Sequence, residues 1–155
     1  MLGQSLTLIS LLCVFAGGPA QTPAPVQKVN VTLVVILASE QGSTVDKRLT
    51  AIADEVRAKN PNLTNFELKS MTSKELALND KTTLALVEDK TVAIAIKQGT
   101  DKEKKICVAV TAPAQGEIVY QCVCDKFLPI CTRYQTKNKE KLILAIRVQT
   151  CKEEK

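Results

Sequence analysis

The first apolar segment of the chain, Val29 to Ser39, reads VNVTLVVILAS. Its alternating apolar positions give way to an unbroken apolar run from Leu33 to Ala38. Alternation is typical of a strand with one buried face, whereas a continuous apolar run is typical of a strand buried on both faces. The pattern therefore predicts a first strand over residues 29–39, placed centrally in a sheet.

A change of period follows the turn at EQGST. From Val45 to Val56 apolar side chains recur at helical spacing, and charged side chains occupy the positions between them. This spacing predicts one amphipathic helix. Ser43 or Thr44 would serve as its N-cap, and Pro61 in KNPN prevents its continuation.

The helical period does not return after Pro61. Alternating segments are separated by turn-forming sequences at Glu88–Lys90, Pro113–Gly116 and Lys137–Lys139, which divide this part of the chain into about seven strands. We therefore expect an α+β fold, with one amphipathic helix after a first strand, packed on a mostly antiparallel multi-stranded sheet or β-sandwich. The repeated strand–helix units of a doubly wound nucleotide-binding fold are missing from the pattern.

The N-terminal twenty residues carry no charge and contain an apolar run from Leu6 to Ala16. This composition is typical of a secretory signal peptide, with cleavage expected after Ala20. The run is shorter than the about 20 residues that a membrane-spanning helix needs. We divide the chain into a signal peptide (1–20), a lead expected to be disordered (21–28), a single α+β domain (29–151) and a charged tail (152–155). The protein is thus expected to be exported, to a periplasm or to the medium, with no transmembrane segment after cleavage.

The composition excludes several kinds of chemistry. Because the sequence contains no histidine, catalytic triads and general bases that use imidazole are ruled out. No glycine-rich phosphate loop or calcium-binding loop occurs. The net charge is +5, but the basic residues alternate with acidic ones along the chain. Aromatic residues, which would stack on nucleic-acid bases, make up only 3% of the chain. We predict a protein that is not an enzyme, needs no cofactor and binds no nucleic acid.

Five cysteines remain after the expected cleavage, namely Cys107, Cys122, Cys124, Cys131 and Cys151. Export permits disulfides, whereas CVC on a strand differs from the C-x₂₋₄-C pairs of zinc sites, so no metal site is predicted. The turn at 113–116 would place Cys107 opposite Cys122 or one residue away, and the last hairpin would bring Cys151 near Cys124. We predict the disulfides Cys107–Cys122 and Cys124–Cys151, with Cys131 as a free thiol. A local Cys124–Cys131 bridge is the alternative.

Four segments of the chain, VTLVVILAS, VDKRL, FELKSMTSKELAL and KFLPICTRYQTKNKEKLILAIRVQ, suggest a family. Together they resemble small exported proteins of uncharacterised function from planctomycete- and myxobacterium-type bacteria. The resemblance covers Val29 to Gln149 and includes a closing hairpin of the PFF…Y…LVLAI kind, although the turns here are less rich in glycine. It implies an exported bacterial α+β protein and transfers no catalytic residue.

Several functions are compatible with these patterns. We favour an exported non-enzymatic binding or accessory module of unknown ligand. Its partner would be a protein bound at a sheet edge, because exposed strands accept a partner strand. The alternatives are a disulfide-linked structural component of the cell envelope and a cysteine-dependent redox protein. Arg133 and Arg147, each within an apolar strand, are either simply exposed or mark a binding face of the last hairpin.

Overall fold

The protein folds as two four-stranded sheets and one helix, and it is known from a computed structural model that describes residue 18 and residues 27–151. Apart from Gly18, the predicted signal peptide lies outside these residues, as do the first part of the lead and the charged tail. The elements are β1 (Lys28–Ser39), η1 (Lys47–Leu49), α1 (Thr50–Lys59), β2 (Asn65–Ala77), β3 (Lys81–Ala85), β4 (Thr91–Gln98), β5 (Lys105–Thr111), β6 (Glu117–Val123), β7 (Phe127–Gln135) and β8 (Lys141–Thr150). The expected α+β class is confirmed.

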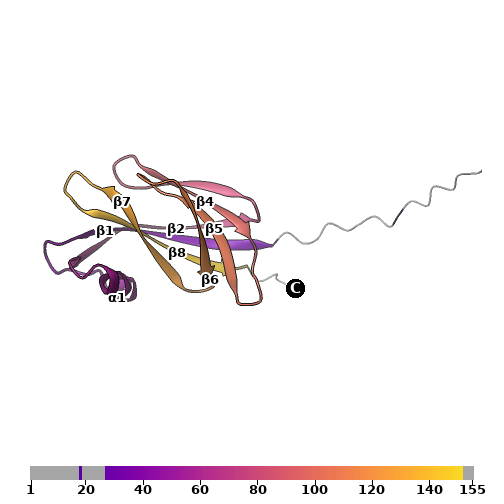
Figure 1. Cartoon of the computed structure of the whole chain (residues 1–155), viewed down its shortest axis with the longest axis horizontal. Helices are drawn as coiled ribbons and strands as arrows, with labels where there is room; N and C mark the ends of the chain where they lie inside the picture. Colours follow the sequence, from indigo (N-terminus) through magenta and orange to yellow (C-terminus); the bar gives the residue numbers. More distant parts are fainter. Residues whose placement is uncertain (1–17, 19–26, 152–155) are drawn as a thin grey trace, which may run out of the picture.

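The two sheets have the strand orders β2-β1-β8-β7 and β3-β4-β5-β6, and their paired strands are antiparallel. Figure 1 shows the strands of the two sheets lying over one another, with α1 beside one end of the first sheet. We call the first sheet A and the second sheet B. Among the described residues, no helix is long and apolar enough to cross a membrane.

Strand β1 is buried on both faces, as its apolar run predicts. Leu33 and Val35 belong to the core between the two sheets, together with Leu144 on β8. Ile36 on the opposite face belongs to a second core, in which α1 packs against sheet A together with Phe66. The central place of β1, between β2 and β8, accounts for an apolar run without the polar alternation of an ordinary antiparallel strand.

The alternating segments form strands with the predicted faces inward. Three residues of β4, three of β5 and four of β8 belong to the core between the sheets: Val92, Ile94, Ile96, Ile106, Val108, Val110, Leu142, Leu144, Ile146 and Val148. None of these side chains is measurably exposed. The turns predicted at 88–90, 113–116 and 137–139 all lie between paired strands.

Hydrogen bonds join the turns of two hairpins, one from each sheet. Glu88, which has a φ of +52°, lies in the β3–β4 turn, and its Oε1 accepts a hydrogen bond of 3.0 Å from the backbone N–H of Lys137 in the β7–β8 turn. The Tyr134 hydroxyl donates to Glu88 Oε2. The hydrogen bond from Tyr134, followed by that from Lys137, lowers the pKa of the Glu88 carboxyl. These contacts hold the two sheets together at this end of the sandwich.

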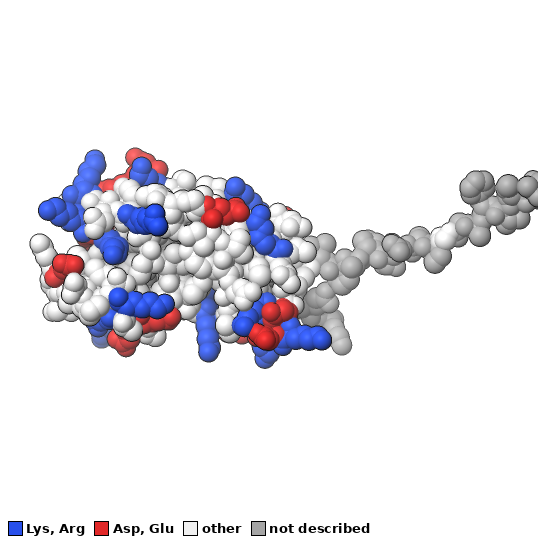
Figure 2. All heavy atoms as spheres, in the orientation of Figure 1, with Lys and Arg blue, Asp and Glu red and all other residues white. Residues whose placement is uncertain are grey.

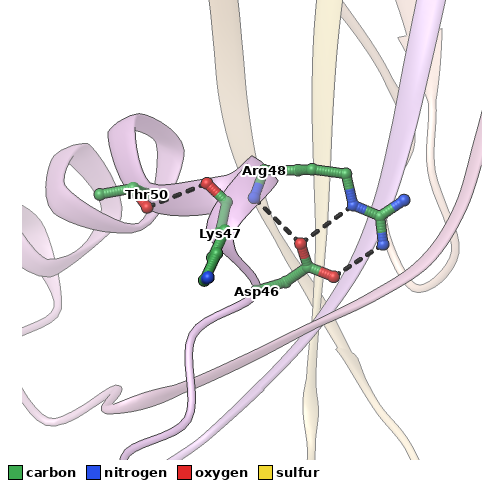
Figure 3. A network of polar contacts seen from close by, with 4 residues as sticks. All are labelled: Asp46, Lys47, Arg48 and Thr50. Atoms are coloured by element: carbon green, nitrogen blue, oxygen red, sulfur yellow. Dashed lines mark hydrogen bonds and ion pairs between the residues drawn. The ribbon is translucent and has the colours of Figure 1, made fainter.

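The helical segment begins later than predicted. Val45 forms an isolated parallel β-bridge with Phe66. The N-cap of the short helix η1 is Asp46, and not Ser43 or Thr44. Figure 3 shows the Asp46 carboxylate accepting the backbone N–H of Arg48 at 3.0 Å and the Arg48 Nη2 at 2.8 Å. The bridge holds Val45 in extended conformation, so the chain enters the short helix η1 only at Lys47 and α1 at Thr50.

The Asp46–Arg48 pair is expected to make stability depend on pH. Hydrogen bonds from Arg48 lower the pKa of Asp46 from 3.8 to about 2. The ionised carboxylate therefore stabilises the folded state above pH 4, and this contribution is lost as the pH falls from 4 toward 2. Asp46→Asn keeps an oxygen for the Arg48 N–H but removes the charge, so its modest loss of stability at neutral pH should disappear at low pH.

Urea unfolding of both proteins across this pH range measures the effect. Asp54→Asn is the control, because the Asp54 carboxylate lies 3.7 Å from the Arg57 Nη1, against 2.8 Å between Asp46 and Arg48. A loss for Asp46→Asn that is constant with pH, or equal to that of Asp54→Asn, would contradict the assignment of this stabilisation to the Asp46 charge.

Candidate functional site

The five described cysteines are free thiols, and the strand register separates two of those predicted to pair. Cys107 lies opposite Gln121, and Cys122 lies opposite Ile106 in the core between the sheets. Opposite residues of an antiparallel pair share a face, so Cys107 and Cys122 point to opposite faces of sheet B. The register thus lies within the expected range, one residue from direct facing, and the Cys107–Cys122 disulfide stays a prediction about the oxidised protein.

The other predicted pair is not joined in this structure either. Cys151 lies against β2, where its Sγ is 3.6 Å from Glu75 Oε1, while the backbone N–H of Cys124 donates to the Lys104 carbonyl. Cys124 packs against the core between the sheets, and Cys131 is exposed on β7. The Cys124–Cys151 disulfide stays a prediction about the oxidised protein.

Four of the five described thiols are poorly suited to redox or nucleophilic chemistry. Burial raises the pKa of Cys122 to about 11. Desolvation also raises the pKa of Cys124, Cys131 and Cys151. Because the thiolate is the reactive form, a raised pKa leaves little of it at neutral pH. Within the described residues, no group of three or more Cys, Asp or Glu side chains is arranged to hold a metal ion.

The two arginines of the last hairpin have different surroundings. Arg133 is exposed on β7. Arg147 is half-buried on the outer face of sheet A, with its guanidinium 4.9 Å from the centre of the Phe127 ring. Arg147 thus packs on an aromatic ring, whereas Arg133 is exposed to solvent.

One end of sheet A is hollowed where the end of β1 lies near the β7–β8 turn. The hollow has a volume of about 580 Å³, and its walls include Glu40, Asn65, Lys139, Glu140 and Lys141. Acidic and basic groups are mixed around it: Glu40 and Lys139 are exposed, and Glu140 and Lys141 are half-buried. Nothing in this arrangement selects one class of ligand.

The edges of the two sheets differ in how well they are protected against pairing with another chain. In sheet A, β2 carries Glu67, Lys69, Lys74 and Glu75, and the opposite edge β7 contains Pro129 and Arg133. In sheet B, β3 has only five residues and begins with Lys81. Charges, proline and shortness are the usual means by which edge strands avoid adding a further strand.

Strand β6, the remaining edge, carries a single charge, Glu117 at its first residue, and no proline. The seven residues from Ile118 to Cys124, IVYQCVC, contain no charge and no proline. Ile118, Val119 and Val123 are 42%, 56% and 39% exposed, which is unusual for large apolar side chains in one short strand. In Figure 2 the middle of the visible face, which β6 crosses in Figure 1, is largely free of charged side chains.

The register of β6 with β5 fixes the direction of its side chains. Ile118, Tyr120 and Cys122 lie opposite Val110, Val108 and Ile106, which face the core between the sheets. Val119, Gln121 and Val123 therefore share the outer face of sheet B. Beside Val119 this face is formed by the small side chains of Ala109 and Ala95, so Val119 stands above its neighbours.

The candidate functional site is thus the β6 edge and the apolar side chains along it. Sequence reasoning identified the strand and suggested a sheet edge, but it did not indicate that β6 was that edge. The available signal was the uncharged run IVYQCVC among charged segments. Comparison of the chain with protein-family models, with curated proteins and with solved structures gives no match.

Proposed function

We propose that this protein is an exported, non-enzymatic binding module that takes an extended segment of a protein partner as an added strand on β6. The observation that carries this proposal is a proline-free edge strand that is uncharged after its first residue, Glu117, and has three exposed large apolar side chains. In strand addition the backbone groups of the edge supply affinity, and alternate side chains supply selectivity. Val119 and Val123 would contact alternate side chains of the added segment on the outer face.

Two further observations support a binding role. The raised thiol pKa values speak against the redox alternative, as only a small thiolate fraction is present at neutral pH. The uncharged apolar N-terminal stretch supports export, to a periplasm or to the medium. A binding role of this kind needs no cofactor.

Hydrogen–deuterium exchange with a defined set of peptides tests the proposal. The probes are eight-residue peptides with valine or isoleucine at alternate positions and mixed charges between them. Binding is expected to slow amide exchange in β6 and not in β2. Val119→Lys places a charge on the β6 edge and should weaken binding by roughly tenfold or more.

Met71→Lys is the matched control, because Met71 is an exposed apolar residue, 51% exposed, on the opposite sheet's edge strand β2. It should leave peptide binding unchanged. Protection in β2 instead of β6, or equal weakening by the two lysine substitutions, would overturn the proposal. So would the absence of protection with every peptide of the set.

A further inference from the structure

We infer that the segment added to β6 is β6 of a second copy of this chain, in an antiparallel pair centred on Gln121. The inference rests on the proposed function, since it names the partner of the same edge. It would join two copies of sheet B into one continuous sheet of eight strands, because each copy has four. In the part of the chain that the structure describes, no strand pairs with the free side of β6.

The sequence of β6 is complementary to itself in this register. A two-fold axis through Gln121 places Val119 of each copy opposite Val123 of the other, on the outer face. It places Tyr120 opposite Cys122 and Ile118 opposite Cys124 on the face toward the core. The exposed apolar residues of the edge, at 56%, 39% and 42% for Val119, Val123 and Ile118, are thereby paired with apolar residues. Cross-strand pairs of this kind stabilise a sheet.

Neighbouring registers are poorer. In antiparallel pairing only shifts that keep outer residues opposite outer residues are allowed, so the centre moves by whole residues along β6. A centre at Tyr120 places Glu117 opposite Val123. A centre at Cys122 places Val119 opposite Asp125, whose backbone N–H instead donates to the Val148 carbonyl outside the sheet. The centre at Gln121 is the one that pairs all seven uncharged residues with one another, and it places Glu117 opposite Asp125 only at the ends of the pair, where Asp125 lies beyond β6.

Charge favours a second copy over the other edges of the molecule. Between Ile118 and Cys124 the edge meets its own copy without facing charges, and like charges, Glu117 and Asp125, face one another only at the two ends of the pair. A copy of β2 would instead bring charged side chains together along the middle of the strand. With a net charge of +5 two copies repel weakly at a distance, and the uncharged part of β6 is where they approach with the least cost. The largely uncharged middle of the face in Figure 2 agrees with this.

Sedimentation equilibrium over the micromolar range tests the inference on the full chain after removal of residues 1–20. The wild type is expected to form a dimer. Val119→Lys should raise the dissociation constant by roughly tenfold or more, because the two-fold axis duplicates the unfavourable pair. Met71→Lys should leave it unchanged, and circular dichroism should show that both variants are folded.

Cross-linking tests the register. Gln121→Cys should form a disulfide between two copies, since directly opposite Cα atoms lie about 4.5–5.5 Å apart and a disulfide spans that separation. Ser70→Cys, exposed on β2, is the control and should not link. Both variants carry Cys131→Ser, which removes the exposed native thiol. They also carry Cys107→Ser, because Cys107 lies opposite position 121 in the same chain and would compete for the disulfide. Peptide mapping should find Cys at position 121 joined to itself.

The outcomes separate this inference from the proposed function. A wild type that stays monomeric while β6 still binds peptides overturns self-pairing and leaves the binding function in place. A dimer that Val119→Lys does not weaken, or that links through position 70, overturns the assignment to β6. Failure of both dimerisation and peptide binding removes both proposals.

Discussion

Replacing Leu144 with alanine is expected to lower the free energy of unfolding by about 2–5 kcal/mol. Leu144 lies on the inner strand β8, opposite Val35 and Ile130, and is fully buried in the core between the sheets. The substitution removes its apolar contacts and leaves a cavity that neighbouring strands cannot fill without losing their register. Urea unfolding at neutral pH measures the loss.

Leu78→Ala is the matched control for this experiment. Leu78 follows β2 and is 45% exposed, so the same change should alter stability by no more than about 0.5 kcal/mol. The pair of variants compares one residue type in two environments. Equal losses would mean that Leu144 is not part of a packed inter-sheet core, and the sandwich architecture would be wrong.

The strands can be predicted from the sequence because burial of one face imposes an alternation of apolar and polar residues on each strand separately. Alternation places Val92, Ile94 and Ile96 on one face whatever strand they pair with, and they are all buried. The continuous apolar run of β1 likewise indicates two cores. The helix is identified by its spacing, since three of its residues, Ile52, Ala53 and Val56, contact the second core.

The division of the strands between two sheets depends on pairing between distant segments, which the local pattern of residues does not record. Strand β1 pairs with β2 and with β8, at the far end of the chain, while β3 to β6 pair only in chain order. Alternation of apolar and polar residues is the same in a single sheet and in a sandwich of two sheets, so the sequence did not decide between these two architectures. The same limit hid the exposure of β6, because whether a strand is an edge depends on pairing far along the chain.

The sequence left the relative position of Cys107 and Cys122 open by one residue, and the register of β5 with β6 decides it. The turn at 113–116 limits the register to within one residue, but one residue is enough to move a side chain to the other face. The structure pairs Ile106 with Cys122, so an apolar residue and a buried thiol share the core. The predicted start of the helix was wrong because it also depends on a distant contact. Val45, expected to be helical, pairs instead with Phe66, which lies far along the sequence.

Phe66→Ala is expected to lower the free energy of unfolding by about 3–5 kcal/mol. Phe66 is 1% exposed and belongs to the core between sheet A and α1, with the Arg57 guanidinium 5.2 Å from its ring centre. Its backbone N–H donates to the Thr44 carbonyl, and its carbonyl accepts the N–H of Asp46, so the residue also fixes the chain that leads into the helix.

The substitution should affect α1 more than the rest of the molecule. A helix of ten residues is too short to persist without packing, so loss of the Phe66 ring should speed amide exchange in α1 before it does so in β4 or β8. Phe127→Ala is the control: this ring is half-buried at the margin of the same core and covered by Arg147, so its loss should cost less. Uniform acceleration of exchange across α1, β4 and β8 would mean that the two cores unfold as one unit. An equal effect of the two variants would contradict the placement of Phe66 at the centre of the core between sheet A and α1. Only a ring enclosed by both the sheet and the helix stabilises both of them.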